Sequence, residues 1–457
     1  MFFAYLHMIL FIERKWKNMK NLILFLLSFP ISVFADTKCA SMHDVPQHEL
    51  TLQEVIELGL CRNPQTSAAY MALQAARFTK NAAHSVYLPS FSGSAGAQRS
   101  HTQHEDWNYS ASISASYLVF DFGKRESDFA ETLALYRATG FDYDETIQNY
   151  VYSVIGAYYA LLIADADVAA AESALTVAQT AKNTADKKYK AGAVAQADVF
   201  KADTTLASSQ LSLERAKNNR EITKGTLLNA LSFPADKNIK IKDMPANFGA
   251  DAESENIEKL ISIAQKQRPD LLKATAQTSA AFHRKNSAFL KNLPAFSING
   301  TVTVNDKTVG GMFDNMSTKV NGKFGVSISM PIFTGFSNFY NARAAMADYE
   351  STKYLEQSAS NNAVMDVFTA YQNYQTAKTV LHQTKILLKS AIENERVTSG
   401  MYRVGRATML DWQTAQSELV DARKQNNNAK YDLFVKRGAV ALAIGDIKSG
   451  LRDADNE

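Results

Sequence analysis

The feature that most constrains the fold is the length of chain that contains no helix breaker. Between Ser337 and Ser399 there is neither proline nor glycine, and as one helix this stretch would extend about 95 Å at 1.5 Å per residue. The stretch from Lys124 to Lys190 contains no proline and only Gly140 and Gly156, which weaken a helix without ending it. Such helices far exceed those of globular domains. We therefore expect them to pack against other helices along their length.

The sequence also repeats itself. Three residues recur 205 positions later, and five further along the chain recur 213 positions later. Pro64, Pro89 and Phe91 return as Pro269, Pro294 and Phe296, whereas Phe120, Tyr158, Tyr189, Gly192 and Asp198 return as Phe333, Tyr371, Tyr402, Gly405 and Asp411. The offset between the halves grows from 205 to 213 residues, which places an insertion in the polar segment from Asn305 to Gly322. The composition of this segment predicts a loop. The chain is expected to fold as two similar halves.

The long stretches carry a heptad seam in which every second position holds a small residue. The seam positions are Leu161, Val168, Leu175 and Tyr189 with Ala164, Ala171, Ala178 and Ala185 in the first half, and Tyr374, Leu381, Leu388 and Tyr402 with Ala377, Thr384, Ala391 and Thr398 in the second. Lys182 and Glu395 interrupt the seam at equivalent positions. This pattern predicts closely approaching coiled-coil helices, either as a barrel or bundle or as a structural rod.

Between the helices, four runs of about ten residues alternate apolar with uncharged polar side chains. They form two predicted β-hairpins, over residues 90–120 and 295–332, whose polar positions are mainly Ser, Thr and Asn. A strand of this length crosses an outer membrane when tilted, although a soluble sandwich also alternates. Four strands are too few to close a membrane barrel, which needs about eight or more. A membrane barrel would have to be shared between copies of the chain.

The amino terminus predicts export. Residues 1–35 combine a basic region, the apolar run from Leu22 to Ala35 and a small-residue cleavage site at Ala35. Met19 is the favoured true start, and the residues before it are either a long basic region or an unused upstream start. The apolar run is the only one noted and is too short to span a membrane as a helix. In an oxidising compartment Cys39 and Cys61 are expected to form a disulfide, with lipid attachment at Cys39 as the alternative.

Charge and motifs exclude several classes of function. The net charge of +3 belongs entirely to residues 1–35, so the mature chain is close to neutral and nucleic acid is not an expected partner. The sequence contains no Gly-x-Ser-x-Gly, no Walker loop and no His-Glu-x-x-His. We expect no enzyme activity, no cofactor and no metal site. His101 and His104 have metal-ligand spacing, but they lie in the polar segment 98–108, which is expected to be an extracellular loop between two strands.

Taken together, these motifs resemble those of the TolC-like outer membrane efflux proteins. The shared order is Leu-Pro-x-Phe, a strand hairpin, a long helix, a turn with Tyr-x-x-Gly-x-x-x-x-x-Asp and a return helix, all present twice between Leu50 and about Gly445. The resemblance implies a mixed α and β membrane protein that forms a homotrimer. Four strands per chain would share a transmembrane β-barrel, continued by a long coiled-coil α-helical barrel.

The expected domain boundaries follow the repeat. Residues 1–35 are the signal peptide region, and residues 36–232 are the first repeat, consisting of a helix, the hairpin 90–120 and a helical hairpin 124–231. Residues 233–265 are an equatorial linker, which its composition indicates to be exposed and irregular. Residues 266–446 are the second repeat, with the hairpin 295–332 and a helical hairpin 337–445, and residues 447–457 are a C-terminal tail.

The resemblance also implies where control resides. In this family the periplasmic tips close the channel, and Asp198, Tyr402 and Asp411 match its gate residues, while Gly192 and Gly405 mark the tip turns that contact an adaptor. Ala407 and Thr414 stand where the family pattern has an arginine and a second acid, with Arg406 one position early. Independently of the family, Asp198 and Asp411 also suit the first turns of their return helices, as cap or first-turn acids.

The implied function is the outer membrane exit duct of a tripartite export system in a Gram-negative bacterium. Its partners would be a periplasmic adaptor protein, outer membrane lipids and an inner-membrane transporter of the resistance-nodulation-division, ABC or major facilitator type. Small-molecule efflux is favoured over type I protein secretion. The alternative is a non-conducting periplasmic coiled-coil adaptor or spacer.

Overall fold

The computed structural model describes residues 45–46, 48–101, 105–243, 256–306 and 319–447. The predicted signal peptide region 1–35, Cys39 and residues 448–457 of the expected tail lie outside these residues. The chain divides into two units, Met1–Val45 and Pro46–Glu457, and the description below concerns the second unit by itself.

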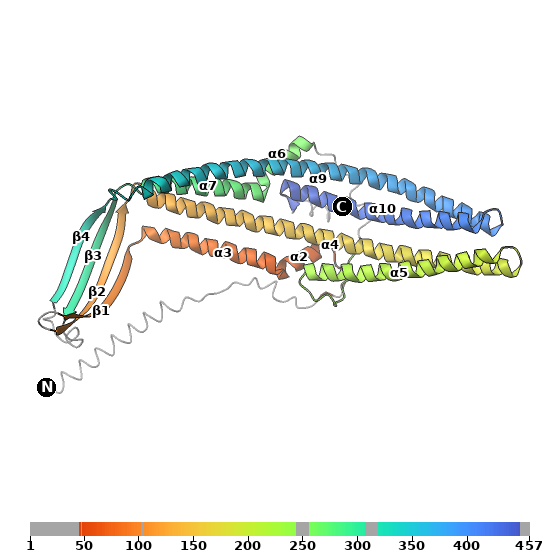
Figure 1. Ribbon diagram of the computed structural model, residues 1–457, viewed down its shortest axis with the longest axis horizontal. Helices are drawn as coiled ribbons and strands as arrows, with labels where there is room; N and C mark the ends of the chain where they lie inside the picture. The colour runs from red at the N-terminus through yellow and green to blue at the C-terminus, as the bar shows by residue number, and fades with distance from the viewer. Residues whose placement is uncertain (1–44, 47, 102–104, 244–255, 307–318, 448–457) are drawn as a thin grey trace, which may run out of the picture. The chain divides into compact units, whose positions relative to one another are not determined.

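The second unit consists of long helical hairpins and one small sheet (Figure 1). In chain order the elements are α2 (Leu52–Arg62), α3 (Pro64–His84), the short 3-10 helix η1 (Ser85–Tyr87), β1 (Ser90–His101), β2 (Glu105–Phe120), α4 (Lys124–Lys190), α5 (Gln196–Ala230), α6 (Ile257–Gln267), α7 (Pro269–Leu290), β3 (Ala295–Asp306), β4 (Lys319–Ser329), α9 (Ser337–Arg403) and α10 (Met409–Ile444). Within this unit, the sheet lies at one end of α4 and α9, and the turns to α5 and α10 lie at the other (Figure 1).

The two longest helices, α4 and α9, contain 67 residues each and begin in the same way. A pair of residues with positive φ precedes each: Phe122 and Gly123 before α4, and Gly335 and Phe336 before α9. The left-handed conformation is unfavourable for a side chain such as phenylalanine, so each pair contains one glycine. These pairs turn the chain sharply from strand into helix.

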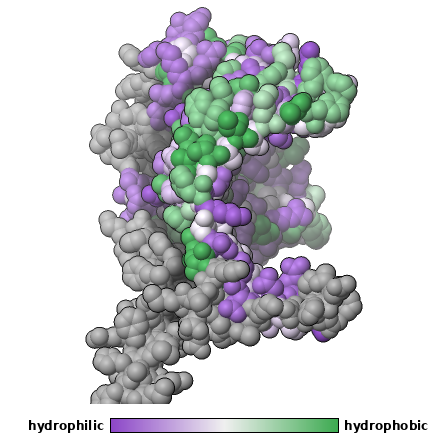
Figure 2. All heavy atoms as spheres, turned by 90° about the vertical axis from the view of Figure 1, so that its left-hand side faces the viewer, coloured by the Kyte–Doolittle hydropathy of each residue, from purple (hydrophilic) through white to green (hydrophobic). Residues whose placement is uncertain are grey.

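The sheet is a four-stranded antiparallel meander in the order β1-β2-β3-β4. Its register places apolar residues opposite one another, for example Ile113 opposite both Gly93 and Val302, and Val326 opposite Ile298. Many of these side chains are exposed, including Phe91, Ile113, Val302, Phe324, Val326 and Ile328, which are all at least half exposed. Figure 2, which faces the end that carries the sheet, shows hydrophobic residues gathered on this surface.

The opposite face of the sheet is polar and hydrogen-bonds to itself. Ser94 and Ser112 share a hydrogen bond of 2.8 Å between β1 and β2. From β2, the Ser116 hydroxyl donates to Asn299 Oδ1 at 2.8 Å, and Asn299 Nδ2 donates to Ser327 Oγ at 2.7 Å. Thus one row of polar side chains crosses from β2 through β3 to β4.

Burial confirms most of the small-residue positions of the predicted seam. Ala164, Ala178 and Ala185 on α4 are buried, as are Ala377, Thr384 and Ala391 on α9. Tyr189 is an exception, because 44 % of it is exposed whereas its counterpart Tyr402 is only 2 % exposed. Within one chain, α10 covers Tyr402 through Trp412, and no described helix covers Tyr189 in this way.

The apolar run from Leu22 to Ala35 is not the only one, contrary to expectation. A window of α4 has a mean hydropathy of 1.5 and would cross a membrane by length and composition alone. The window is 39 % buried, and Val154, Tyr158 and Leu161 of α4 are at most 2 % exposed. Since α4 packs against α2, α3, α5, α7 and α10, we interpret the window as partly buried between the helices.

Three expected loop or strand boundaries were wrong. Residues at both ends of the segments 98–108 and 305–322 pair as strands, because polar side chains are tolerated where a strand end meets water. In contrast, β4 ends at Ser329, shortly before Pro331, which cannot donate to a ladder.

The structure of the linker 233–265 also differs from the exposed, irregular segment that its composition predicts. Phe233 and Ile239 are buried, Ile241 bridges to Leu50, and α6 begins at Ile257. Tyr158 on α4 donates through its hydroxyl to the Lys242 carbonyl at 2.6 Å. The described part of this segment is thus packed against the helices rather than exposed.

Gly445, at the end of α10, allows the sharpest test of packing in the helical part. Its φ is +80°, and an added Cβ would lie 2.8 Å from Arg268 Cα. At Gly192, with φ +72°, an added Cβ would meet nothing within 4 Å. Replacing Gly192 with Ala should cost about 1–2 kcal/mol of backbone strain, whereas Gly445→Ala should cost about 1–3 kcal/mol more through the clash.

This difference can be measured as the shift in guanidinium unfolding midpoint, followed by the loss of helical circular dichroism. Equal shifts for Gly192→Ala and Gly445→Ala would contradict the contact between Gly445 and Arg268.

Candidate functional site

The candidate site lies at the two tip turns, between α4 and α5 and between α9 and α10. Gly192 and Gly405 occupy equivalent positions, with φ of +72° and +79°. Neither has an atom within 4 Å of where a Cβ would be. Glycine is therefore needed at both turns for the left-handed backbone and not for close packing.

Asp411 caps the start of α10. The Thr408 backbone N–H donates to Asp411 Oδ2 at 2.8 Å, the Thr408 hydroxyl donates to the same oxygen at 2.7 Å, and the Asp411 N–H donates back to Thr408 Oγ1 at 3.2 Å. This is a capping box. Hydrogen bonds from the Thr408 side chain and backbone hold the pKa of Asp411 below its usual value. The first-turn role expected for Asp411 is therefore present.

Asp198 occupies the equivalent place in α5 but is not bound in the same way. The N-cap of α5 is Ala195, which makes no side-chain cap bond. Asp198 lies in the first turn, where a negative charge is favourable beside the helix N-terminus. Its carboxylate is consequently outside any capping box, unlike that of Asp411.

Tyr402 belongs to a buried cluster between the two hairpins. Its ring centroid lies 5.1 Å from that of Trp412, and both pack with Ala181, Ala185, Ala202 and Met409. Burial raises the pKa of Tyr402, and the charge of Asp198 adds to the rise. Within the described residues the Tyr402 hydroxyl has no hydrogen-bond partner, so the structure brings Tyr402 and Asp198 near each other without a hydrogen bond.

The two charged residues that interrupt the seam both have partners. Lys182 pairs with Asp186 at 2.8 Å and with Asp203 on α5 at 3.0 Å. Glu395 accepts a hydrogen bond of 3.0 Å from Trp412 Nε1. Both interruptions thus join a long helix to its return helix, which explains how the seam tolerates them.

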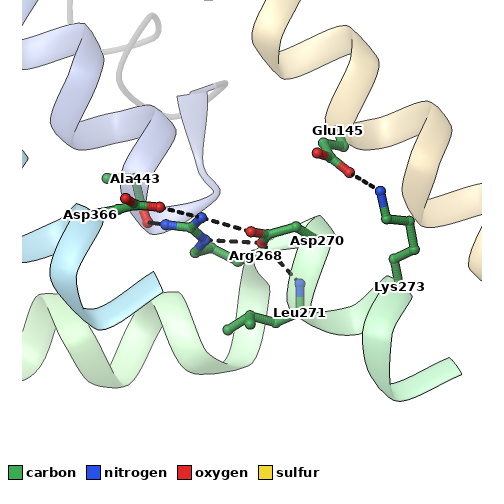
Figure 3. A network of polar contacts seen from close by, with 7 residues as sticks. All are labelled: Glu145, Arg268, Asp270, Leu271, Lys273, Asp366 and Ala443. Atoms are coloured by element: carbon green, nitrogen blue, oxygen red, sulfur yellow. Dashed lines mark hydrogen bonds and ion pairs between the residues drawn. The ribbon is translucent and has the colours of Figure 1, made fainter. Parts of the chain in front are cut away.

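A second polar cluster, which the sequence analysis missed, surrounds Arg268 between α6 and α7 (Figure 3). Its guanidinium donates to Asp270 through Nε at 3.0 Å and Nη2 at 2.7 Å, to Asp366 Oδ2 on α9 at 3.0 Å, and to the Ala443 carbonyl on α10 at 3.2 Å. One side chain therefore ties α7 to both helices of the second hairpin.

The charges of this cluster are balanced by contact. Burial alone would raise the pKa of Asp270, but the hydrogen bonds and charge of Arg268 outweigh it and hold this pKa below its usual value. Nearby, Lys273 on α7 pairs with Glu145 on α4 at 2.5 Å (Figure 3), and with Asp142 on the same helix at 3.0 Å. The Arg-Pro-Asp motif at Arg268 could have indicated the contact with Asp270. The contact with Asp366 could not be predicted, because Asp366 is distant in sequence.

The remaining predicted site residues add no chemistry. Cys61 lies in α2, and Cys39 lies outside the described residues, so the disulfide stays a prediction. Within the described part of the chain, no three His, Cys, Asp or Glu residues are grouped to hold a metal ion.

The class of protein follows from comparison with known families. The family described as "Outer membrane efflux protein" matches residues 55–232 and 260–446. The chain belongs to this family. It is located in the outer membrane of a Gram-negative bacterium and extends into the periplasm.

Relatives and solved structures fit this assignment. "Toxin and drug export protein A" of Aggregatibacter actinomycetemcomitans is 22 % identical over 85 % of this chain and 85 % of its own length. "Outer membrane protein TolC" of Escherichia coli is 23 % identical over 94 % of this chain and 87 % of its own. The structure of VceC from Vibrio cholerae has a TM-score of 0.76 and 18 % identity, covering 86 % of this chain and 96 % of that one.

The difference between the two return helices can be tested by exchanging their caps. Thr408→Ala should cost about 1 kcal/mol by removing the α10 cap, and Ala195→Thr should gain up to about 1 kcal/mol, because Asp198 already stands where a capping box needs its acid. Guanidinium unfolding measures both. Thr414→Ala, which removes only a hydroxyl bonded to the Leu410 carbonyl within α10, is the matched control, and a loss equal to that of Thr408→Ala would argue against the cap.

The Arg268 cluster predicts a pH dependence. Because the pKa of Asp270 is lowered on folding, its stabilisation is present above the unfolded value of about 3.9 and is lost as the pH falls through the folded value. The difference in unfolding free energy between wild type and Asp270→Asn should therefore be constant near neutral pH and shrink below about pH 4. Asp366→Asn is the control, since Asp366 is more exposed, and it should cost less at neutral pH.

Proposed function

We propose that this protein is the exit duct of a tripartite export system and conducts its substrates passively out of the cell, without catalysis. The observation that carries the proposal is the sheet, which has one apolar and one polar face and two edge strands, β1 and β4. Unpaired edges are not tolerated in hydrocarbon. Three copies joined edge to edge would give a closed barrel of twelve strands, in keeping with the trimer that the family resemblance implies.

The chemistry of the strands supports a polar lumen. Hydroxyl and amide side chains line one face, and Lys323 shares this face because it pairs with Thr301. A lysine facing lipid at the middle of a membrane costs about 2–4 kcal/mol, which favours the polar face as the inner one. The coiled-coil hairpins would continue the duct as an α-helical barrel through the periplasm.

The gate of the duct is proposed at the tips. Asp198, Tyr402 and Asp411 remain its candidate residues, and Asp198 is the strongest because its carboxylate is outside a capping box. Asp411 would serve both as cap and as gate acid. The exposed turns at Gly192 and Gly405 are proposed to contact the periplasmic adaptor.

The partners and cargo follow from the same proposal. An adaptor and an inner-membrane transporter of one of the three expected types would supply the energy, since the chain has no nucleotide-binding motif. Small-molecule efflux is favoured over type I protein secretion, and the name of the relative "Toxin and drug export protein A" is compatible with both. We also propose the repeat boundaries given above, with residues 233–265 as the linker between the halves, and a disulfide between Cys39 and Cys61.

Single-channel recording in planar bilayers tests the duct and its gate. Purified wild type should insert with a small, mostly closed conductance, and Asp198→Ala should open it more than Asp411→Ala, because part of Asp411 is engaged by Thr408. Asp203→Ala, whose carboxylate pairs with Lys182 farther from the turn, is the matched control and should remain closed.

The other outcomes separate the two parts of the proposal. Insertion without any effect of Asp198→Ala would leave the duct and remove the gate acid. A folded protein that extracts without detergent and never inserts would indicate the periplasmic adaptor or spacer instead.

A further inference from the structure

We propose that Lys188 is the latch that holds the two helical hairpins together at their tips. This inference rests on the proposed duct and concerns how its tip is kept closed. It names a positioning residue that neither the repeat nor the gate pattern contains. Lys188 lies in the last turn of α4, four residues before Gly192.

One ammonium group makes two contacts with the end of α9. Lys188 Nζ lies 4.1 Å from the centroid of the Tyr402 ring and donates a hydrogen bond to the Tyr402 carbonyl. Tyr402 is in the last turn of α9, where carbonyls carry negative partial charge, and its carbonyl also accepts the Gly405 N–H at 3.2 Å. The aromatic face adds a favourable cation–π contact. Lys188 thus caps the helix of the other hairpin.

The charge of Lys188 is committed to this contact. Within the described residues no ion pair involves Lys188, although neighbouring Lys182 has two acidic partners. A lysine held by a ring and a carbonyl keeps its position only while both hairpins stay together. Separation of the hairpins would return the ammonium to water.

Of the hydrogen bonds between the α4–α5 hairpin and the α9–α10 hairpin, the one made by Lys188 lies nearest the tip turns. Other bonds lie farther from the tips: Gln413 Nε2 donates to the Lys201 carbonyl at 3.2 Å and to the Thr205 hydroxyl, Gln416 Nε2 to the Ala174 carbonyl at 3.3 Å, and Arg423 Nη1 to Ser173 Oγ at 2.9 Å. Opening that starts at the tips would have to break the Lys188 contact first.

The latch lies over an apolar contact between the hairpins. Ala181, Ala185 and Ala202 of the first hairpin pack against Tyr402 and Trp412 of the second. This apolar contact has no hydrogen bond to the Tyr402 ring hydroxyl within the described residues. Lys188 adds a polar, directional contact to Tyr402 at the end of this cluster.

The second half of the chain supplies the variant for a test. Met401 stands 213 residues after Lys188 at the equivalent position of α9. Methionine packs on aromatic rings but donates no hydrogen bond and carries no charge. Lys188→Met therefore removes the latch while keeping much of the side-chain volume. Lys187→Met removes one charge from an exposed neighbour on the same turn and is the matched control, and Lys188→Arg keeps a cation that stacks on rings.

Two measurements on the full-length protein test the latch. Single-channel recording should show an open fraction about tenfold higher in Lys188→Met, the size expected for losing a cation–π contact and a charged hydrogen bond. Hydrogen exchange should become faster at the end of α9, over Val404–Arg406, whose amides bond to Gly400, Met401 and Tyr402 carbonyls. Lys187→Met should match wild type in both, and Lys188→Arg should restore most of the closed state.

The failures are distinguishable. If neither wild type nor Asp198→Ala forms a pore, the duct itself fails. If pores form and Lys188→Met gates like Lys187→Met, the latch is overturned, and faster exchange with unchanged gating overturns it as well, because Lys188 would then only cap a helix.

Discussion

A backbone N–H or C=O group in hydrocarbon has no water to bind, and in the proposed duct this constraint would govern the sheet. The meander satisfies its inner strands internally, but β1 and β4 each have one outward edge within the chain. The apolar side chains of the sheet are likewise left exposed by the chain itself. In the proposed duct a single copy would therefore be incomplete at its sheet, whereas its helical hairpins bury most of the small residues of their seams.

The long helices and the strands could be predicted because local signals and the fold agree. Glycine-containing turns precede Lys124 and Ser337, where α4 and α9 begin, and alternation of side chains gave the faces of the sheet. Strand ends were harder, since polar residues such as Asn305 suit a loop and an exposed ladder equally. Arg268 was out of reach, because its partner Asp366 is brought near only by tertiary packing.

At the tips, the two halves of the chain differ in the N-cap residue, which is Ala195 in α5 and Thr408 in α10. This difference decides whether the equivalent aspartate takes part in a capping box. Asp198 and Asp411 occupy the same place in the repeat, and the sequence left open whether each is a cap or a gate acid. As caps the two residues differ through their neighbours: Thr408 engages Asp411, whereas Ala195 cannot engage Asp198. The contrast between Tyr189 and Tyr402 has the same origin, because similar sequence positions meet different surroundings within one chain.

The hydroxyl row across the sheet has a consequence for the solutes that would pass it. Ser94, Ser112, Ser116, Asn299 and Ser327 already satisfy one another, so a passing molecule gains little by exchanging its hydration shell for theirs. Away from Lys323, which shares this face, such a wall would neither bind a solute tightly nor repel it strongly. Throughput would then be set by diffusion along the pore, and a single wall of this kind could serve chemically unrelated cargo.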